Sequence, residues 1–369
     1  MGLQTSTNRY KSVTPQHPNV TLDGFDEIRS TVLVTWFTKA TTALVGGVLA
    51  ASALGGCSGE PKPKPAATTK PAPGTHPTVP ATNPLTGLVG APPGPVIAVK
   101  LDDTAPGRPS LGVEKADVIY IEEVEGGLSR MVAVFASAKP RVRAVRSVRP
   151  SDPELLGQYG KIIVVATGGG GSSLPALDRS DLRSSINDRG QVGFTRDPSR
   201  AAPYNVVSDL AKVSRAIKAD GVRDVGFQWA AKDARLARAK SAPKVSTLVG
   251  STPVGFVWDA KEARYVRLVG GQRIRAASGA PVAKPNVLVQ YCKVRPDRSD
   301  IDVRGNPTMY TESVGKGRAV LFRGGKRIEG KWSRARVGAR TNFTDLGGNR
   351  LLFAPGGTFV ALARPGSPA

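Results

Sequence analysis

Lys161-Ile-Ile-Val-Val-Ala166 is followed directly by Thr167-Gly-Gly-Gly-Gly-Ser-Ser173. The first run predicts a short strand that is buried on both faces of a sheet, and Leu174-Pro-Ala-Leu177 behind the glycines favours the start of a helix. A strand, a glycine loop and a helix N-terminus in succession present bare backbone N–H groups to an anion. The loop lacks the Gly-Lys-Ser/Thr ending of a nucleotide-binding P-loop, and a merely flexible turn remains the alternative interpretation.

Strand patterns surround this stretch. Residues 95–101, 116–124 and 131–136 are β-branched runs, and the apolar spacing of residues 205–219 predicts a helix. We therefore expect a mixed α/β domain with a central sheet over residues 85–245. Helical periodicity disappears after residue 245, so the overall class is α+β.

Short strands punctuated by Gly-Gly and Pro-Gly fill residues 246–369, including a hairpin over Arg318–Trp332 around Gly324-Gly325. This smaller part is expected to be mostly β, as a small sandwich or partial barrel. It is also the more cationic part, since it holds 21 basic and 8 acidic side chains, against 24 and 17 in residues 85–245.

The N-terminal segment resembles an export signal. Residues 40–56 are uncharged, follow Lys39 and end in Leu54-Gly-Gly-Cys57, which is similar to a bacterial lipobox whose cysteine is lipidated with acyl chains such as palmitate. Residues 1–56 are thus expected to be a signal peptide, with the true start near Val32 or Val34. Residues 57–84, rich in proline, would be a tether that holds the protein on the extracytoplasmic face of the cell membrane.

Histidine scarcity limits the chemistry. The chain has only His17 and His76, so a Ser-His-Asp triad or a His-ligated zinc site has no imidazole in the folded part. Cys292 is the only cysteine beyond Cys57 and lies in an apolar run, where a small buried hydrophobe is the favoured interpretation. We predict no cofactor and no metal site. Whether the protein is an enzyme stays open, and the sequence favours a non-enzymatic role.

Polar segments of the first domain supply the candidate ligand-binding residues. They end apolar strands, surround glycine turns or precede the predicted helix, as loops at a sheet edge do. Strand alternation places Glu123 and Glu125 on one face and Glu122 on the other, so these acids do not all share one site. A surface ion-pair network is the alternative for the whole set, and a helix cap is the alternative for Asn205. The candidates are Asp102, Asp103, Glu122, Glu125, Arg130, Arg146, Ser147, Arg149, Gly169, Gly170, Ser172, Arg196, Asp197 and Asn205.

These motifs, in order, carry a family resemblance. Asn83-Pro-Leu-Thr-Gly87, VKLDD (99–103), ADVIYIEEVEGGLSR (116–130), VRSVRP (145–150) and FTRDPSRAAPYN (194–205) resemble the YerB-type lipoproteins with their two-part DUF3048 domain, and residues 330–332, 341–343 and 355–359 resemble its second part. The resemblance implies an acylated surface protein of similar fold, without a settled activity. Thr167 and Tyr204 stand where relatives often have histidine.

Three functions remain in competition. The first is a cell-surface lipoprotein that binds an anionic envelope component, such as a wall polymer, peptidoglycan or lipid phosphate, through its arginines. The second is a carboxylate-based or hard-metal-dependent hydrolase of an envelope glycan. Nucleic-acid binding, suggested by nine basic residues between Lys316 and Arg340, is disfavoured by export. The first requires Asp102, Glu122, Arg146 and Gly169 to line one cleft.

Overall fold

The computed structural model describes residues 81–302 and 304–369. The lipobox with Cys57, residues 57–80 of the proline-rich tether and both histidines lie outside these residues, so the expectations for them stay predictions. The end of the predicted tether is described, and there Asn83 is buried in the fold and donates to Ser137 Oγ at 2.9 Å. Within the described residues, no helix is long and apolar enough to cross a membrane.

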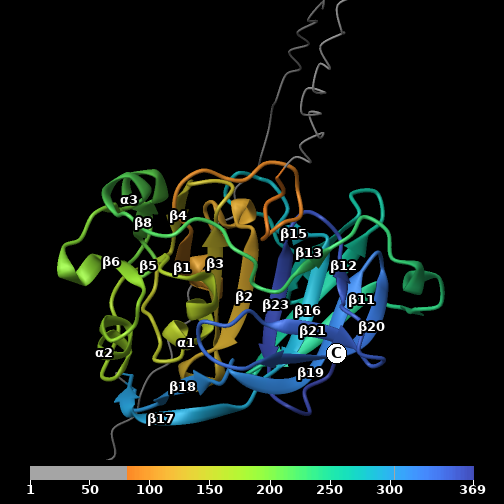
Figure 1. Ribbon diagram of the computed structural model, residues 1–369. Helices are drawn as coiled ribbons and strands as arrows, with labels where there is room; N and C mark the ends of the chain where they lie inside the picture. The colour runs from red at the N-terminus through yellow and green to blue at the C-terminus, as the bar shows by residue number, and fades with distance from the viewer. Residues whose placement is uncertain (1–80, 303) are drawn as a thin grey trace, which may run out of the picture. The chain divides into compact units, whose positions relative to one another are not determined.

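One large sheet runs through both halves of this part of the chain (Figure 1). In spatial order its main path is β10 (Lys240–Ser241), β20 (Lys326–Arg334), β19 (Gly315–Arg323), β16 (Asn286–Tyr291), β23 (Thr358–Ala363), β2 (Val118–Glu123), β3 (Ser129–Phe135), β1 (Ile97–Asp102), β5 (Ile163–Ala166) and β6 (Arg183–Ile186), with β21 (Asn342–Asp345) on β20. Strands β1, β5 and β6 pair in parallel, whereas β3 runs antiparallel between β1 and β2.

The two halves meet where β2 pairs in parallel with β23, in register from Val118 opposite Thr358 to Ile121 opposite Ala361. All six residues of each strand are buried, as expected of parallel strands covered on both faces. Apolar side chains alternate between the two sides: Ile97 and Val99 belong to one core, Ala98 and Val132 to the other. The predicted central sheet is therefore present, but it extends into the second half, where a smaller sheet packs against it through side chains such as Phe256 on Phe359.

The remaining strands form small sheets. They are β11 (Lys244–Val249), β12 (Thr252–Asp259), β13 (Arg264–Val269), β14 (Gln272–Arg273) and β15 (Ala283–Lys284) in one sheet; β17 (Val294–Ile301) with β18 (Pro307–Thr311); β4 (Arg141–Arg143), β8 (Val206–Asp209) and β7 (Phe194–Arg196); and β22 (Leu352–Phe353) with β9 (Gln228–Trp229). The hairpin predicted around Gly324-Gly325 is confirmed as β19 and β20.

Helices are few and short. They are α1 (Asp152–Leu156), α2 (Ser173–Asp178) and α3 (Leu210–Ala216), with 3₁₀ turns η1 (Ala105–Gly107), η2 (Val113–Lys115), η3 (Glu125–Gly127), η4 (Gly157–Tyr159), η5 (Asn187–Arg189) and η6 (Ala234–Ala237). The first half is accordingly dominated by sheet, although the coarser α+β class holds.

The helix expected over 205–219 is wrong at its start. Residues 206–209 form β8, paired with β4 and β7, and tertiary pairing of this kind overrides a helical spacing of apolar residues. Helix α3 begins only at Leu210, and its N-cap is Asp209, which accepts a hydrogen bond from Lys212 N at 3.0 Å. Asn205 is therefore not the helix cap.

Candidate functional site

The candidate site lies where β1 and β5 separate at their carboxyl ends. The segment after β4 enters between them: Arg146 N donates to Lys100 O at 2.9 Å, and Thr167 N donates to Arg146 O at 2.9 Å. Val148 N then donates to Gly168 O at 2.9 Å. The arginine motif is thus held by backbone hydrogen bonds from strands on both sides, and it lies between two interior strands rather than in the loop at a sheet edge that the sequence predicted.

Strand register brings four charged residues onto one face. Arg130 on β3 is opposite Asp102 on β1 and also opposite Glu122 on β2. Cross-strand neighbours have Cβ atoms about 4.5–5.5 Å apart, so the guanidinium has a carboxylate on either side. Lys100, two residues before Asp102, faces the same side.

Lys100 is fully buried and is the centre of a charge cluster that the sequence analysis missed. Its ammonium contacts the carboxylate of Glu122 and lies 3.0 Å from Asp152 Oδ1. Burial lowers the pKa of Lys100 to about 8, against the opposing effect of Asp152. Asp152 also accepts a hydrogen bond from Arg149 N at 2.7 Å, which ties helix α1 to the arginine motif. A lysine within an otherwise apolar strand was the available signal.

Arg149 is bound by groups of the fold itself, a buried carboxylate and two backbone carbonyls. It pairs with the buried carboxylate of Glu125 and donates through Nη1 to the carbonyls of Ser147 and Val148 at 3.1 and 2.8 Å. Thr308 Oγ1, from β18, donates to Glu125 Oε1 at 2.8 Å. Burial alone would raise the pKa of Glu125, but Arg149 and these hydrogen bonds outweigh burial and lower it.

Arg130 and Arg146 differ from Arg149, because neither guanidinium donates a hydrogen bond to any residue that the structure describes. The nearest carboxylates are Glu125 Oε2, at 4.0 Å from Arg130, and Asp102 Oδ2, at 3.4 Å from Arg146 Nε. Arg146 also lies 5.4 Å from the centre of the Tyr204 ring. The two side chains are 12% and 19% exposed, so both reach solvent.

The positive charges near Arg130 affect its pKa. Burial, followed by the neighbouring charges of Arg149 and Arg146, lowers the pKa of Arg130 to about 9. A bound anion would counter all three effects, because it solvates the guanidinium and screens the two positive neighbours.

The glycine loop does not lie open. A Cβ at Gly170 would collide with the carboxylate of Asp300, and one at Gly169 would approach Val148 Cγ2 to 2.9 Å. Ser172 Oγ donates to Asp297 Oδ2 at 2.8 Å, and Ser173 Oγ donates to Asp300. The loop therefore packs against the β17–β18 hairpin, which contributes acidic side chains from the second half of the chain.

The other candidates lie apart from the cluster. Asp103 points to the opposite face, where it accepts from Ser129 Oγ and Arg267 Nη2, both at 2.8 Å. Asp197 pairs with Arg143 at 2.5 Å, and Arg196 donates to Asn205 Oδ1 at 3.1 Å. Ser147 Oγ lies 3.3 Å from Thr167 Oγ1.

The expected separation of the glutamates is only partly observed. Glu122 contacts Lys100, whereas Glu123 faces the other side and pairs with Arg364 at 2.7 Å. Glu125, predicted to share a face with Glu123, instead joins Arg149. The reason is that β2 ends at Glu123 and Glu125 begins the 3₁₀ turn η3, where the alternation of a strand no longer applies.

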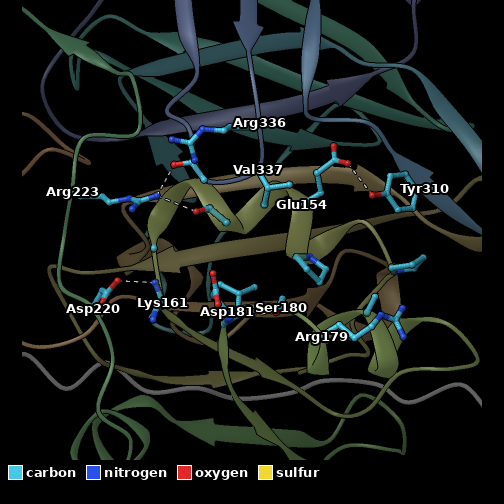
Figure 2. Close-up of a pocket in the computed structure, with 17 residues that line it drawn as sticks. Glu154, Lys161, Arg179, Ser180, Asp181, Asp220, Arg223, Tyr310, Arg336 and Val337 are labelled. Atoms are coloured by element: carbon cyan, nitrogen blue, oxygen red, sulfur yellow. Dashed lines mark hydrogen bonds between the residues drawn. The ribbon is translucent and has the colours of Figure 1, made fainter.

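A pocket of about 640 Å³ lies on the other side of helix α1 (Figure 2). Pro153 and Glu154 of α1 line it, together with Tyr310 from β18 and residues 336–338. Tyr310 OH donates to Glu154 Oε2 at 2.9 Å, and Arg223 donates to the carbonyls of Gly157 and Gly338, both at 3.0 Å. Its basic residues, Lys161, Arg179, Arg223 and Arg336, were not predicted from the sequence because they come from four separate segments.

No group of three or more histidine, cysteine, aspartate or glutamate side chains suited to a metal ion occurs in the described part of the chain. Cys292 is buried, and burial raises the pKa of its thiol to about 12, in keeping with the predicted inert residue.

Sequence comparison places this two-part fold in a family. The models of the protein of unknown function DUF3048 match, the N-terminal domain at residues 85–223 and the C-terminal domain at residues 244–360. The chain belongs to the DUF3048 family, which confirms the resemblance drawn from its motifs.

A solved structure has the same fold. The YerB protein from Bacillus subtilis matches with a TM-score of 0.65 and 23% identity, over 76% of this chain and 96% of the YerB chain. No curated protein matches the chain.

Proposed function

We propose that the protein is an extracytoplasmic, lipid-anchored binding protein that holds an anionic component of the cell envelope at Arg130 and Arg146. The observation that carries this proposal is that two adjacent, partly exposed guanidinium groups lack hydrogen-bond acceptors among the described residues. Arg130 Nη1 is buried without a partner, and such a donor costs about 1–3 kcal/mol, so an oxyanion that accepts from it would recover stability as it binds. Planar guanidinium groups suit carboxylate and phosphate oxygens in particular.

The surroundings support a polymeric rather than a small ligand. Helix α1 lies between the arginine pair and the basic pocket, with Asp152 in the charge cluster and Glu154 in the pocket wall. Lys161, Arg179 and Arg336 line that pocket, and their side chains form no hydrogen bond or ion pair within the described residues. A chain of repeated anionic groups would meet positive charge at both places. The lipobox around Cys57 would hold the protein beside such polymers.

A test compares Arg146→Gln and Arg130→Gln with Arg189→Gln in the chain carrying Cys57→Ser. The control removes the same charge from a surface pair, since Arg189 pairs with Asp178 at 2.7 Å and both are well exposed. Sedimentation with isolated cell wall, in rising salt, measures retention. Loss of a charge-assisted hydrogen bond worth about 1.5–3 kcal/mol weakens binding by roughly tenfold or more.

The proposal requires the first two variants to lose wall retention at an unchanged melting temperature while Arg189→Gln keeps it. Equal retention by all three variants, or binding that does not respond to salt, would contradict it. Free muramyl peptide, inorganic phosphate and phosphatidic acid vesicles as competitors identify which anionic group is bound.

A glycan hydrolase is the second candidate, favoured by the position of Asp102 and Glu122 on one face. Asp102 and Glu122 lie on the strands on either side of Arg130, so two strand spacings, about 9.5 Å, separate them. This separation is at the upper end of the range for the two carboxyl groups of inverting glycosidases. Both carboxylates are already paired with cations, Glu122 with Lys100 and Asp102 with Arg146, which counts against this candidate. Wall degradation that is present in the parent chain and lost in Asp102→Asn/Glu122→Gln would establish this function instead.

A further inference from the structure

A groove of about 590 Å³ lies on the opposite face of the sheet from Arg130. Strands β11, β12 and β13 of the small sheet form one side, and the turns after β1 and before β3 form the other. The neighbouring residues Asp102 and Asp103 point to opposite faces of the sheet. Asp103 lines the groove, whereas Asp102 lies beside Arg146 in the arginine cluster.

The walls of the groove are mainly apolar. Val245 and Phe256 are buried beneath it, Leu268 and Pro253 form its sides, and Leu128 stands at its edge with 51% of its surface exposed. An exposed leucine beside further apolar side chains gains free energy when a ligand covers it.

Charged side chains also line the groove. Arg267 is 2% exposed and uses Nη2 to donate to Asp103 at 2.8 Å, while its Nε and Nη1 have no acceptor among the described residues. Arg108 donates to Asp103 O at 2.7 Å and lies 3.9 Å from the Asp103 carboxylate. With Lys244 at the margin, three basic side chains line the groove against one acid.

We propose that this groove binds a single-chain amphiphile with an anionic head, its apolar chain against Leu128, Phe256 and Leu268 and its head at Arg267 and Arg108. Charge complementarity selects this occupant, because one acid neutralises only one of the three bases. The volume falls in the usual range for small-ligand pockets. This inference goes beyond the proposed function, since it uses other residues on the other face of the sheet.

The experiment titrates the Cys57→Ser chain by calorimetry with dodecyl phosphate, dodecanoate and dodecyl maltoside, each below its micellar concentration. The phosphate and carboxylate arms distinguish the two possible head groups, and the maltoside tests the apolar contribution alone. Leu128→Gln removes the exposed wall, and Arg108→Gln removes a partly exposed charge. Leu88→Gln is the matched control, because Leu88 is also 51% exposed and does not line the groove.

Binding of one anionic amphiphile per chain, weakened about tenfold by Leu128→Gln and by Arg108→Gln but not by Leu88→Gln, is the expected result. Arg130→Gln should leave this affinity unchanged, so that failure of the proposed wall binding and failure of this inference are distinguishable. No binding of either anionic amphiphile, equal binding of dodecyl maltoside, or equal effects of Leu128→Gln and Leu88→Gln would overturn it.

Discussion

Replacement of Arg149 by alanine should destabilise the fold, and the loss should depend on pH in a specific way. The substitution removes the ion pair with Glu125 and the hydrogen bonds to two carbonyls, while the backbone N–H to Asp152 remains. Glu125 stays buried with Thr308 as its remaining close partner. Breaking a buried ion pair from one side costs about 3–5 kcal/mol.

The lower end of that range is expected, because Arg130 lies only 4.0 Å from Glu125 and takes over part of the interaction. We therefore predict a decrease of about 3 kcal/mol in the free energy of unfolding at pH 7. Chemical unfolding monitored by tryptophan fluorescence provides the measurement. Arg189→Ala, which breaks an exposed pair, should cost less than about 1 kcal/mol.

The pH dependence follows from the direction of the pKa shift. Arg149 lowers the pKa of Glu125 in the folded chain, so the pair stabilises the fold above the ordinary glutamate pKa of 4.5, and this stabilisation is lost as pH falls. Without Arg149, burial dominates and raises that pKa, so a protonated Glu125 no longer needs a partner. The difference between parent and Arg149→Ala should shrink at pH 3.5. Adding Glu125→Gln should restore stability to Arg149→Ala at pH 7. A difference that is equal at both pH values, or no rescue, would refute this account of the pair.

Two further predictions address the glycine loop and a buried lysine. Gly170→Ala should lower the melting temperature and increase hydrogen exchange in residues 294–311, since its Cβ would collide with Asp300; Gly221→Ala, whose Cβ has no neighbour closer than 3.6 Å, should do neither. Burial lowers the pKa of Lys284 to about 8, so between pH 8 and 10 the folded chain has lost a proton that the unfolded chain keeps, and the free energy of unfolding should rise with pH. Lys284→Met should reduce that slope by about 1.4 kcal/mol per pH unit in urea titrations, whereas exposed Lys240→Met should leave it unchanged.

Local patterns predicted much of the first half. The apolar run at residues 161–166 contains β5, and the helix after the glycines is α2. Period-two alternation also separated Glu122 from Glu123. These features depend on contacts within a few residues, where side-chain direction follows directly from strand geometry.

What the sequence did not reveal depends on distant contacts. Asp300 fills the space beside Gly170, and Thr308 reaches Glu125 across 183 positions of sequence. A glycine run looks the same whether it faces a ligand or a carboxylate of its own chain, so the pattern alone does not decide between them. Lys100 was overlooked because a single charge in an apolar strand has several explanations until its partners are known.

Contacts between the two family segments indicate that they fold as one unit. Strand β2 of the first segment has β3 on one side and β23 of the second on the other, so separation would leave the N–H and C=O groups of a fully buried strand unpaired. Glu154 would also lose hydrogen bonds from Tyr310 and from the backbone N–H groups of Ser313 and Val314. The first segment expressed alone therefore has an exposed apolar edge and uncompensated buried charge, and it should aggregate or unfold. The same contacts place β17 and β18 on the glycine loop, so any ligand of the arginine cluster meets a surface built from both segments.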